Sequence, residues 1–162
     1  EMCSTAHLNV AGGTYQNELT TAADLSEAAL EQAVIDIGKW TDDRGLKVAV
    51  RPMSLHIPVD LEFEAERILV SPYRPGVGDN DVNALYTMGK FPKGAHVNHY
   101  FTDTDAWFIK TDCPDGLKHF QRRALEFTID NDFDTENAKY KFTERYVFGV
   151  TDVKSVYGSP GA

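Results

Sequence analysis

Four residues in one short stretch of the chain have side chains of the types that bind metal ions. They are His96, His99, Asp103 and Asp105. Imidazole nitrogens and carboxylate oxygens suit zinc or another divalent ion, so this cluster defines one functional alternative, a metal-dependent hydrolase. The spacing argues against it, because in a strand over residues 96–101 side chains three positions apart point to opposite faces. We therefore predict a surface or packing role for both histidines, and neither a metal nor another cofactor.

Other arrangements that could support catalysis are weaker still. Cys113 could act as a nucleophile with His119 or His99 as its base, but the thiol precedes Pro114 in a turn and no orienting motif accompanies it. Two glycine pairs could suggest a phosphate-binding loop, yet neither has the spacing of a dinucleotide-binding or P-loop motif; they are Gly12 with Gly13, and Gly76 with Gly78. The residues thus predict a protein that is not an enzyme.

Composition limits the class of protein and of partner. The 162 residues suit one folded domain, and 42% hydrophobic with 25% charged residues is ordinary for a globular chain. The formal net charge is -9, which disfavours nucleic acid as a direct ligand because phosphate binding needs clustered Lys and Arg. We therefore expect no sequence-specific binding of nucleic acid.

Three features of the sequence bear on the cellular compartment of the protein. No apolar run approaches the roughly 18 residues of a membrane span, and the first residues lack the pattern of a secretory signal. Cys3 and Cys113 are far apart and form no CxxC pair, which suits a reducing compartment better than a disulfide scaffold. The sequence therefore predicts a soluble, intracellular protein without a membrane partner, and a start at Glu1 suggests a fragment or a processed product.

The first half of the chain predicts helices. Residues 24–40 carry apolar side chains at the spacing of one buried stripe, namely Leu30, Ala33, Val34 and Ile37. The start of this helix is marked either by a capping box of Asp24 with Glu27 or by Ser26 as the cap. A short strand is predicted over residues 46–50, ended by Pro52, and a second helix follows Pro58.

A loop rich in Pro and Gly follows the second helix. Residues 71–81 are predicted to be exposed, because proline and glycine deny the segment regular hydrogen bonding. We predict that this loop contacts a neighbouring subunit through a set of residues near its start: Pro72, Tyr73, Arg74, Pro75, Gly76 and Gly78.

The second half of the chain has the texture of strands. Over residues 138–150 one face carries aromatic and aliphatic side chains while the other carries Lys139, Lys141 and Arg145. Residues 125–133 alternate apolar with acidic side chains, so a turn through residues 134–137 would form a long antiparallel hairpin with matched charges. The aromatic rings predict a hydrophobic core or a subunit contact rather than a base-stacking platform, since three basic residues are too few. The pattern predicts an α+β fold with helices first and mostly antiparallel strands after them.

Many short motifs dispersed along the chain resemble the major capsid proteins of tailed bacteriophages and prophages, including the Mu-like major head subunits. The main ones are residues 61–69 (LEFEAERIL), 81–83 (DVN), 103–108 (DTDAWF), 116–118 (GLK), 140–141 (YK), 144–146 (ERY), 148–149 (FG) and 157–159 (YGS). Upstream, residues 4–7 (STAH), 24–26 (DLS) and 29–30 (AL) fit the same pattern. The resemblance extends over essentially the whole chain.

The resemblance implies the Hong Kong 97 fold and a structural role. The chain would be the C-terminal portion of a subunit that assembles into hexamers and pentamers of an icosahedral head enclosing the genome. Residues 58–111 would lie on the axial-domain side, and residues 1–57 with 112–162 on the peripheral-domain side, of one compact unit. Scaffold, portal or decoration proteins would be further partners, and the protein would be assembled in the bacterial cytoplasm and found in the virion.

Two other assembly functions stay open at this stage. An encapsulin-like compartment protein would share the fold but enclose protein cargo, and a tail or adaptor protein of the same virion would form rings or tubes. The hydrolase that would use His96, His99, Asp103 and Asp105 is the alternative from a different class.

Overall fold

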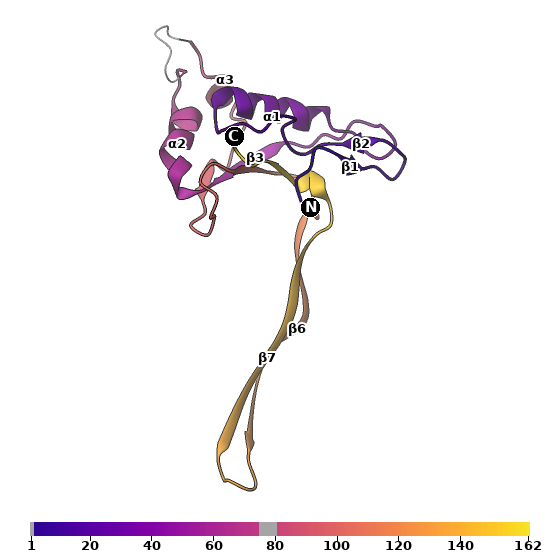
Figure 1. Ribbon diagram of the computed structural model, residues 1–162, viewed down its shortest axis with the longest axis vertical. Helices are drawn as coiled ribbons and strands as arrows, with labels where there is room; N and C mark the ends of the chain where they lie inside the picture. Colours follow the sequence, from indigo (N-terminus) through magenta and orange to yellow (C-terminus); the bar gives the residue numbers. More distant parts are fainter. Residues whose placement is uncertain (1, 75–80) are drawn as a thin grey trace. The chain divides into compact units, whose positions relative to one another are not determined.

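The computed structural model describes residues 2–74 and 81–162 (Figure 1). Contacts divide the chain into two units, one extending to Gly116 and including Asp152–Ala162, the other formed by Leu117–Thr151. We call them the packed unit and the hairpin unit. Residues 1–57 and 58–111 both fall in the packed unit, and the division into an axial and a peripheral side stays a prediction.

Helix α1 (Glu27–Lys39) is the predicted first helix, starting and ending inside the expected range. Of the two proposed caps, Ser26 is the one observed, because its Oγ accepts a hydrogen bond from the Ala29 amide at 3.2 Å. Three members of the predicted stripe, Leu30, Ala33 and Ile37, are at 0% exposure, and the fourth, Val34, is half-buried against the same core. The helix stops at Trp40, whose indole Nε1 donates to the Gln16 carbonyl at 2.9 Å.

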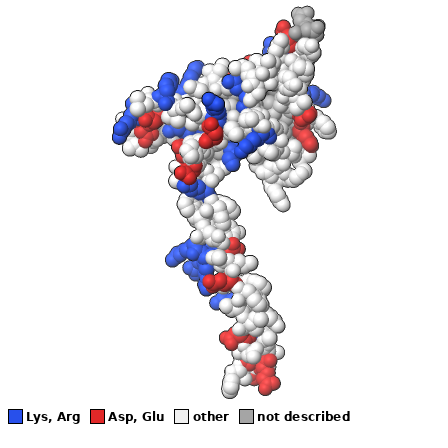
Figure 2. Space-filling model, turned by 180° about the vertical axis from the view of Figure 1, so that it is seen from behind, with Lys and Arg blue, Asp and Glu red and all other residues white. Residues whose placement is uncertain are grey.

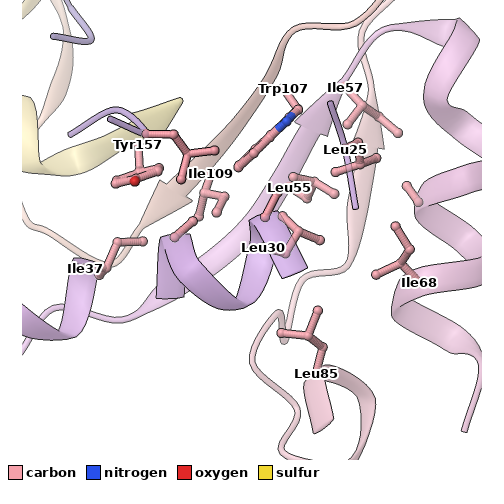
Figure 3. Close-up of a cluster of buried hydrophobic side chains, with 14 of the residues drawn as sticks. Leu25, Leu30, Ile37, Leu55, Ile57, Ile68, Leu85, Trp107, Ile109 and Tyr157 are labelled. Carbon is pink, nitrogen blue, oxygen red and sulfur yellow. The ribbon is translucent and has the colours of Figure 1, made fainter. Parts of the chain in front are cut away.

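A four-stranded sheet underlies this helix. The strands are β3 (Pro52–Ile57), β4 (Ala95–Val97), β5 (Trp107–Thr111) and β8 (Val156–Ser159), in the order β4-β3-β5-β8. The β3–β4 pair is parallel and the other two pairs are antiparallel. Alternate residues of the central strands β3 and β5, joined by Tyr157 of the edge strand β8, form a core with α1 at 0% exposure: Leu55, Ile57, Trp107, Ile109 and Tyr157 (Figure 3).

The strand predicted over residues 46–50 is wrong, because Pro52 begins a strand instead of ending one. Residues 41–47 form a tight turn in which Asp42 Oδ1 accepts hydrogen bonds from the amides of Arg44 and Leu46, both at 2.8 Å. Lys47 makes only an isolated bridge to Thr41. Proline is tolerated as the first residue of a strand, where its missing N–H costs no ladder hydrogen bond.

The predicted second helix is present as a 3₁₀ turn η1 (Val59–Leu61) followed by α2 (Glu62–Val70). A short helix α3 (Ala84–Thr87) was missed, since four residues are too few to show a helical period. The fully buried Asn83 holds these two helices together. Its Oδ1 accepts from the amides of Leu85 and Tyr86, and its Nδ2 donates to the Ile68 and Ser71 carbonyls.

The start of the chain is tied to its end by a second buried asparagine. Strands β1 (His7–Leu8) and β2 (Thr14–Tyr15) form a small hairpin, and Gly12 and Gly13 at its turn have φ of 101° and 84°. The glycines therefore serve turn geometry, as the spacing suggested. Asn17, at 0% exposure, then contacts Val153 in the 3₁₀ turn η2 (Val153–Ser155) and Val156 at the start of β8.

The hairpin unit consists of β6 (Leu117–Asn131) and β7 (Ala138–Val150), paired antiparallel along their whole length (Figure 1). The predicted hairpin and its turn are thus confirmed, with a first strand longer than expected. Asp130 lies opposite Lys139, and the Lys139 Nζ is 2.7 Å from Asp132 Oδ2, so the charges match near the turn as predicted. The α+β class, with its antiparallel C-terminal hairpin, is confirmed as well.

Candidate subunit-contact surface

The structure does not bring the four candidate metal ligands together into one group. His96 lies on β4, whereas His99 follows the end of that strand and is exposed. The predicted strand over residues 96–101 therefore stops at Val97, and alternation along it does not decide where His99 points. Asp103 and Asp105 lie in the following loop, with the Asp105 amide 3.5 Å from Asp103 Oδ1. Across residues 2–74 and 81–162, no three His, Cys, Asp or Glu side chains are grouped closely enough to hold a metal ion.

His96 has a different partner, which the sequence could not reveal. It lies in register with His56 of the parallel strand β3, and the two rings stack with their centroids 5.3 Å apart. His56 Nε2 is also 3.0 Å from Ser54 Oγ. Burial, aided by the neighbouring His96 and Lys110, lowers the pKa of His56 below its ordinary value. The lowered pKa favours the neutral imidazole of His56, whose ring packs on His96 at the sheet.

Cys113 is an inert thiol in this environment. Its Sγ donates to Asp152 Oδ2 at 3.4 Å. Burial and that carboxylate raise the pKa of Cys113 to about 11, so very little thiolate is present near neutral pH. His119, one of its two suggested bases, lies on β6 with its ring against Tyr146 and Phe148.

The proposed contact loop is described only at its ends. Tyr73 forms an isolated antiparallel bridge to Val82, and Arg74 pairs with Glu27 of α1 at 2.9 Å. Pro72 accepts a hydrogen bond from the Asn83 amide at 3.1 Å. The other three named residues, Pro75, Gly76 and Gly78, lie outside the described residues. The ends of the loop are thus anchored on the packed unit, and its contact with a neighbour stays a prediction.

The hairpin unit is dense in exposed apolar side chains, since its 35 residues hold 12 of the 25 exposed large hydrophobic residues in the described part of the chain. One face holds rings that contact each other along the two strands, among them Phe127 with Tyr140 and Phe142, and His119 with Tyr146 and Phe148. The Phe and Tyr side chains among them keep 50 to 73% of their surface exposed. The opposite face also exposes Phe120 and Val147, at 48% and 60%.

Such a hairpin is not self-sufficient. An isolated two-stranded hairpin is marginally stable in water at best, because neither face buries enough apolar surface. Soluble monomers rarely expose contiguous apolar patches of this kind, which instead mark contact sites. The hairpin is therefore the best candidate for a contact surface. From the sequence, its aromatic rings were predicted to lie in a core or at a subunit contact.

Comparison with known proteins identifies the family. The family model described as "Mu-like prophage major head subunit gpT" matches residues 3–92, more than half of the chain. The chain belongs to this family. The matched stretch covers α1, β3, α2 and α3 and ends before β4, β5 and the hairpin unit. No curated protein sequence matches the chain.

Among solved structures, the chain is similar to the "Crystal structure of virus-like particle from Pyrococcus furiosus". The TM-score is 0.47 at 9% sequence identity, and the alignment covers 88% of this chain and 55% of that one. The chain thus spans about half the length of that protein.

Proposed function

We propose that this head-subunit chain is a structural component of an icosahedral bacteriophage head, in which many copies assemble into hexamers and pentamers around the genome. The observation that carries the proposal is the family match over residues 3–92, in a family named for the major head subunit. Closed symmetric assembly suits such a subunit, because each copy repeats the same modest contacts with several neighbours.

The exposed hairpin supports the proposal independently of the family. Its large apolar side chains would be covered where subunits meet, which would supply hydrophobic stabilisation that the single chain lacks. We propose that the role is structural and not enzymatic, and that the subunit is assembled in the host cytoplasm and located in the virion. Scaffold, portal or decoration proteins would be further partners.

The arrangement of the fold is also part of the proposal. We propose a Hong Kong 97-like subunit in which residues 58–111 belong to the axial side and residues 1–57 with 112–162 to the peripheral side. None of the helices among the described residues is long and apolar enough to span a membrane.

Electron microscopy of the complete gene product tests the proposal. The full-length protein that contains this chain would be expressed alone and together with its neighbouring genes, purified, and imaged in negative stain. Closed shells of uniform diameter are the expected result. Rings or tubes would point to a tail or adaptor role instead, and persistent monomers in both preparations would refute assembly.

A further inference from the structure

Three arginines lie close together partway along the hairpin unit. Arg122 and Arg123 are consecutive on β6, and Arg145 lies opposite Arg123 on β7. All three are exposed. We call them the arginine patch. Figure 2 shows Lys and Arg gathered midway along the hairpin, with Asp and Glu toward its far end.

The patch sits where the strand pairing is irregular. Gln121 pairs with Tyr146 and Arg123 pairs with Arg145, so Arg122 is an extra residue on β6. A second register shift follows between Arg123 and Glu126. Bulges of this kind re-aim side chains and leave one residue outside the ladder. Arg122 and Arg145 line one hollow of about 770 Å³ on the hairpin, beside Tyr146 and Val147.

The Arg123–Arg145 pair opposes folding of the isolated hairpin. Like charges placed directly opposite on neighbouring strands destabilise the pairing. Arg123 is compensated, because its guanidinium binds the Glu126 carboxylate through Nε at 2.9 Å and also through Nη2. Arg122 and Arg145 have no ion-pair partner among the described residues. A local conflict of this kind is expected at functional sites, where an external group relieves it.

Charge within the chain indicates what that group is. The hairpin unit contains six Lys and Arg and six Asp and Glu, so its formal net charge is zero, and the packed unit carries the entire net charge of -9. Exposed carboxylates without an ion pair among the described residues include Asp60, Glu62 and Glu66 on η1 and α2. The arginine patch of one copy therefore complements the acidic packed unit of another copy.

Nucleic acid is a poorer match for the same patch. Its binding draws on a basic surface that neutralises several phosphates together. The hairpin offers only as many cations as anions, and Glu144 lies directly beside Arg145 at the hollow. An acidic protein surface can present carboxylates to Arg122 and Arg145 and apolar groups to Tyr146. The backbone of a nucleic-acid duplex presents phosphates but no apolar groups.

We propose that the arginine patch of the hairpin unit binds carboxylates on the packed unit of a second copy of this chain. The arginines then hold the exposed apolar hairpin in one register on its neighbour, since charge complementarity fixes orientation while apolar burial supplies affinity. The inference rests on the proposed function for the existence of a neighbour, and adds which surfaces meet.

Photo-crosslinking identifies the surface that the patch contacts. Val147 lines the same hollow and is 60% exposed, so its replacement by p-benzoylphenylalanine keeps all three arginines. The full-length protein would be mixed from isotopically heavy and light copies, irradiated, digested and analysed by mass spectrometry. Mixed-isotope crosslinks to residues 2–74, 81–116 or 152–162 are expected. Crosslinks to nucleic acid, to another protein or to the same copy alone would overturn the proposal.

A charge reversal with a matched control tests the role of the arginines. Arg145→Glu is expected to weaken self-association at least about tenfold, measured by sedimentation at several salt concentrations. Lys141→Glu makes the same charge change on β7, opposite Thr128 and four residues away, and should stay within about twofold. Equal effects of the two variants would overturn the proposal that the arginine patch makes this contact.

The two proposals fail differently. If the wild-type protein forms no shells but gives mixed-isotope crosslinks, the shell function is wrong and the contact stands. If shells form and Arg145→Glu assembles like Lys141→Glu, the shell function stands and the arginine contact is wrong.

Discussion

Replacing Asn17 by alanine should separate the start of the chain from its end. The two N–H groups of its Nδ2 are shared among three carbonyls, those of Met2 at 2.8 Å and of Val153 and Val156 at 3.0 Å each. Its Oδ1 accepts from the Ser4 amide at 2.9 Å, with His7 Nε2 at 2.8 Å. One buried side chain thus joins three segments that are far apart in sequence.

The cost of that substitution follows from these five contacts. A hydrogen bond contributes about 1 kcal/mol net, and a buried partner left unsatisfied costs about 1–3 kcal/mol. Only the bond to the Val156 carbonyl is fully buried, so water can reach the other partners and soften their loss. We expect Asn17→Ala to lower the free energy of unfolding by about 3 kcal/mol.

A second variant and a control sharpen the measurement. Asn17→Asp keeps the Oδ1 acceptor but turns a carboxylate oxygen toward three carbonyls, so it should destabilise at least as much as alanine at pH 7. Asn98→Ala removes an exposed bond to the Tyr100 amide and should cost less than about 1 kcal/mol. Urea denaturation followed by circular dichroism gives all three values. The reasoning is refuted if Asn17→Ala and Asn98→Ala are indistinguishable.

Three further results are expected. Asn83→Ala should cost about 2–4 kcal/mol in urea denaturation, since two hydrogen bonds to the end of α2 and two that cap α3 are lost, and a cost below about 1 kcal/mol would contradict the assignment. Because burial and His96 lower the pKa of His56 in the folded chain, the unfolded chain binds more protons below pH 6.5. The free energy of unfolding should therefore be steady above pH 6.5 and fall as pH drops from 6.5 through the folded pKa, and His56→Gln should remove this dependence; an unchanged pH profile in the variant would count against this reasoning. With its pKa raised to about 11, Cys113 of the folded protein should react with iodoacetamide at pH 8 roughly 100-fold more slowly than an ordinary free thiol. If mass spectrometry gives equal rates for Cys113 and the free thiol, the thiolate is exposed.

Local patterns predicted the elements whose stabilising contacts are local. The stripe of α1, its Ser26 cap and the alternation of β7 depend on near neighbours in sequence, and all three agree with the structure. The strand expected over residues 46–50 failed because Pro52 suits the beginning of a strand as well as its end. A proline that suits both the start and the end of a strand does not show which one it marks. Pairing with the partner strand decides this, and here the partner of Pro52 lies on β5.

The candidate site shows the same limit at longer range. His96 and His99 are neighbours in sequence, yet His96 stacks on His56, forty positions away, because β3 and β4 pair in parallel. Parallel pairing requires a crossover, and the intervening chain gives no sign of which strands it joins. Asn17 and Asn83 were passed over for the same reason, since their partners lie in distant segments and a lone asparagine has no pattern.

Alternation shows that a strand has an apolar face but does not show what covers it. Trp107 on β5 and Phe148 on β7 are both aromatic residues within strands, yet their exposed fractions are 0% and 73%. The first lies in a core built by its own chain, whereas the second has no such cover in the described residues. A strand pair that exposes both faces and places two arginines opposite one another has its favourable contacts elsewhere. For a member of a head-subunit family, we propose that a neighbouring copy supplies them, which closed symmetry would repeat at every equivalent position of a shell.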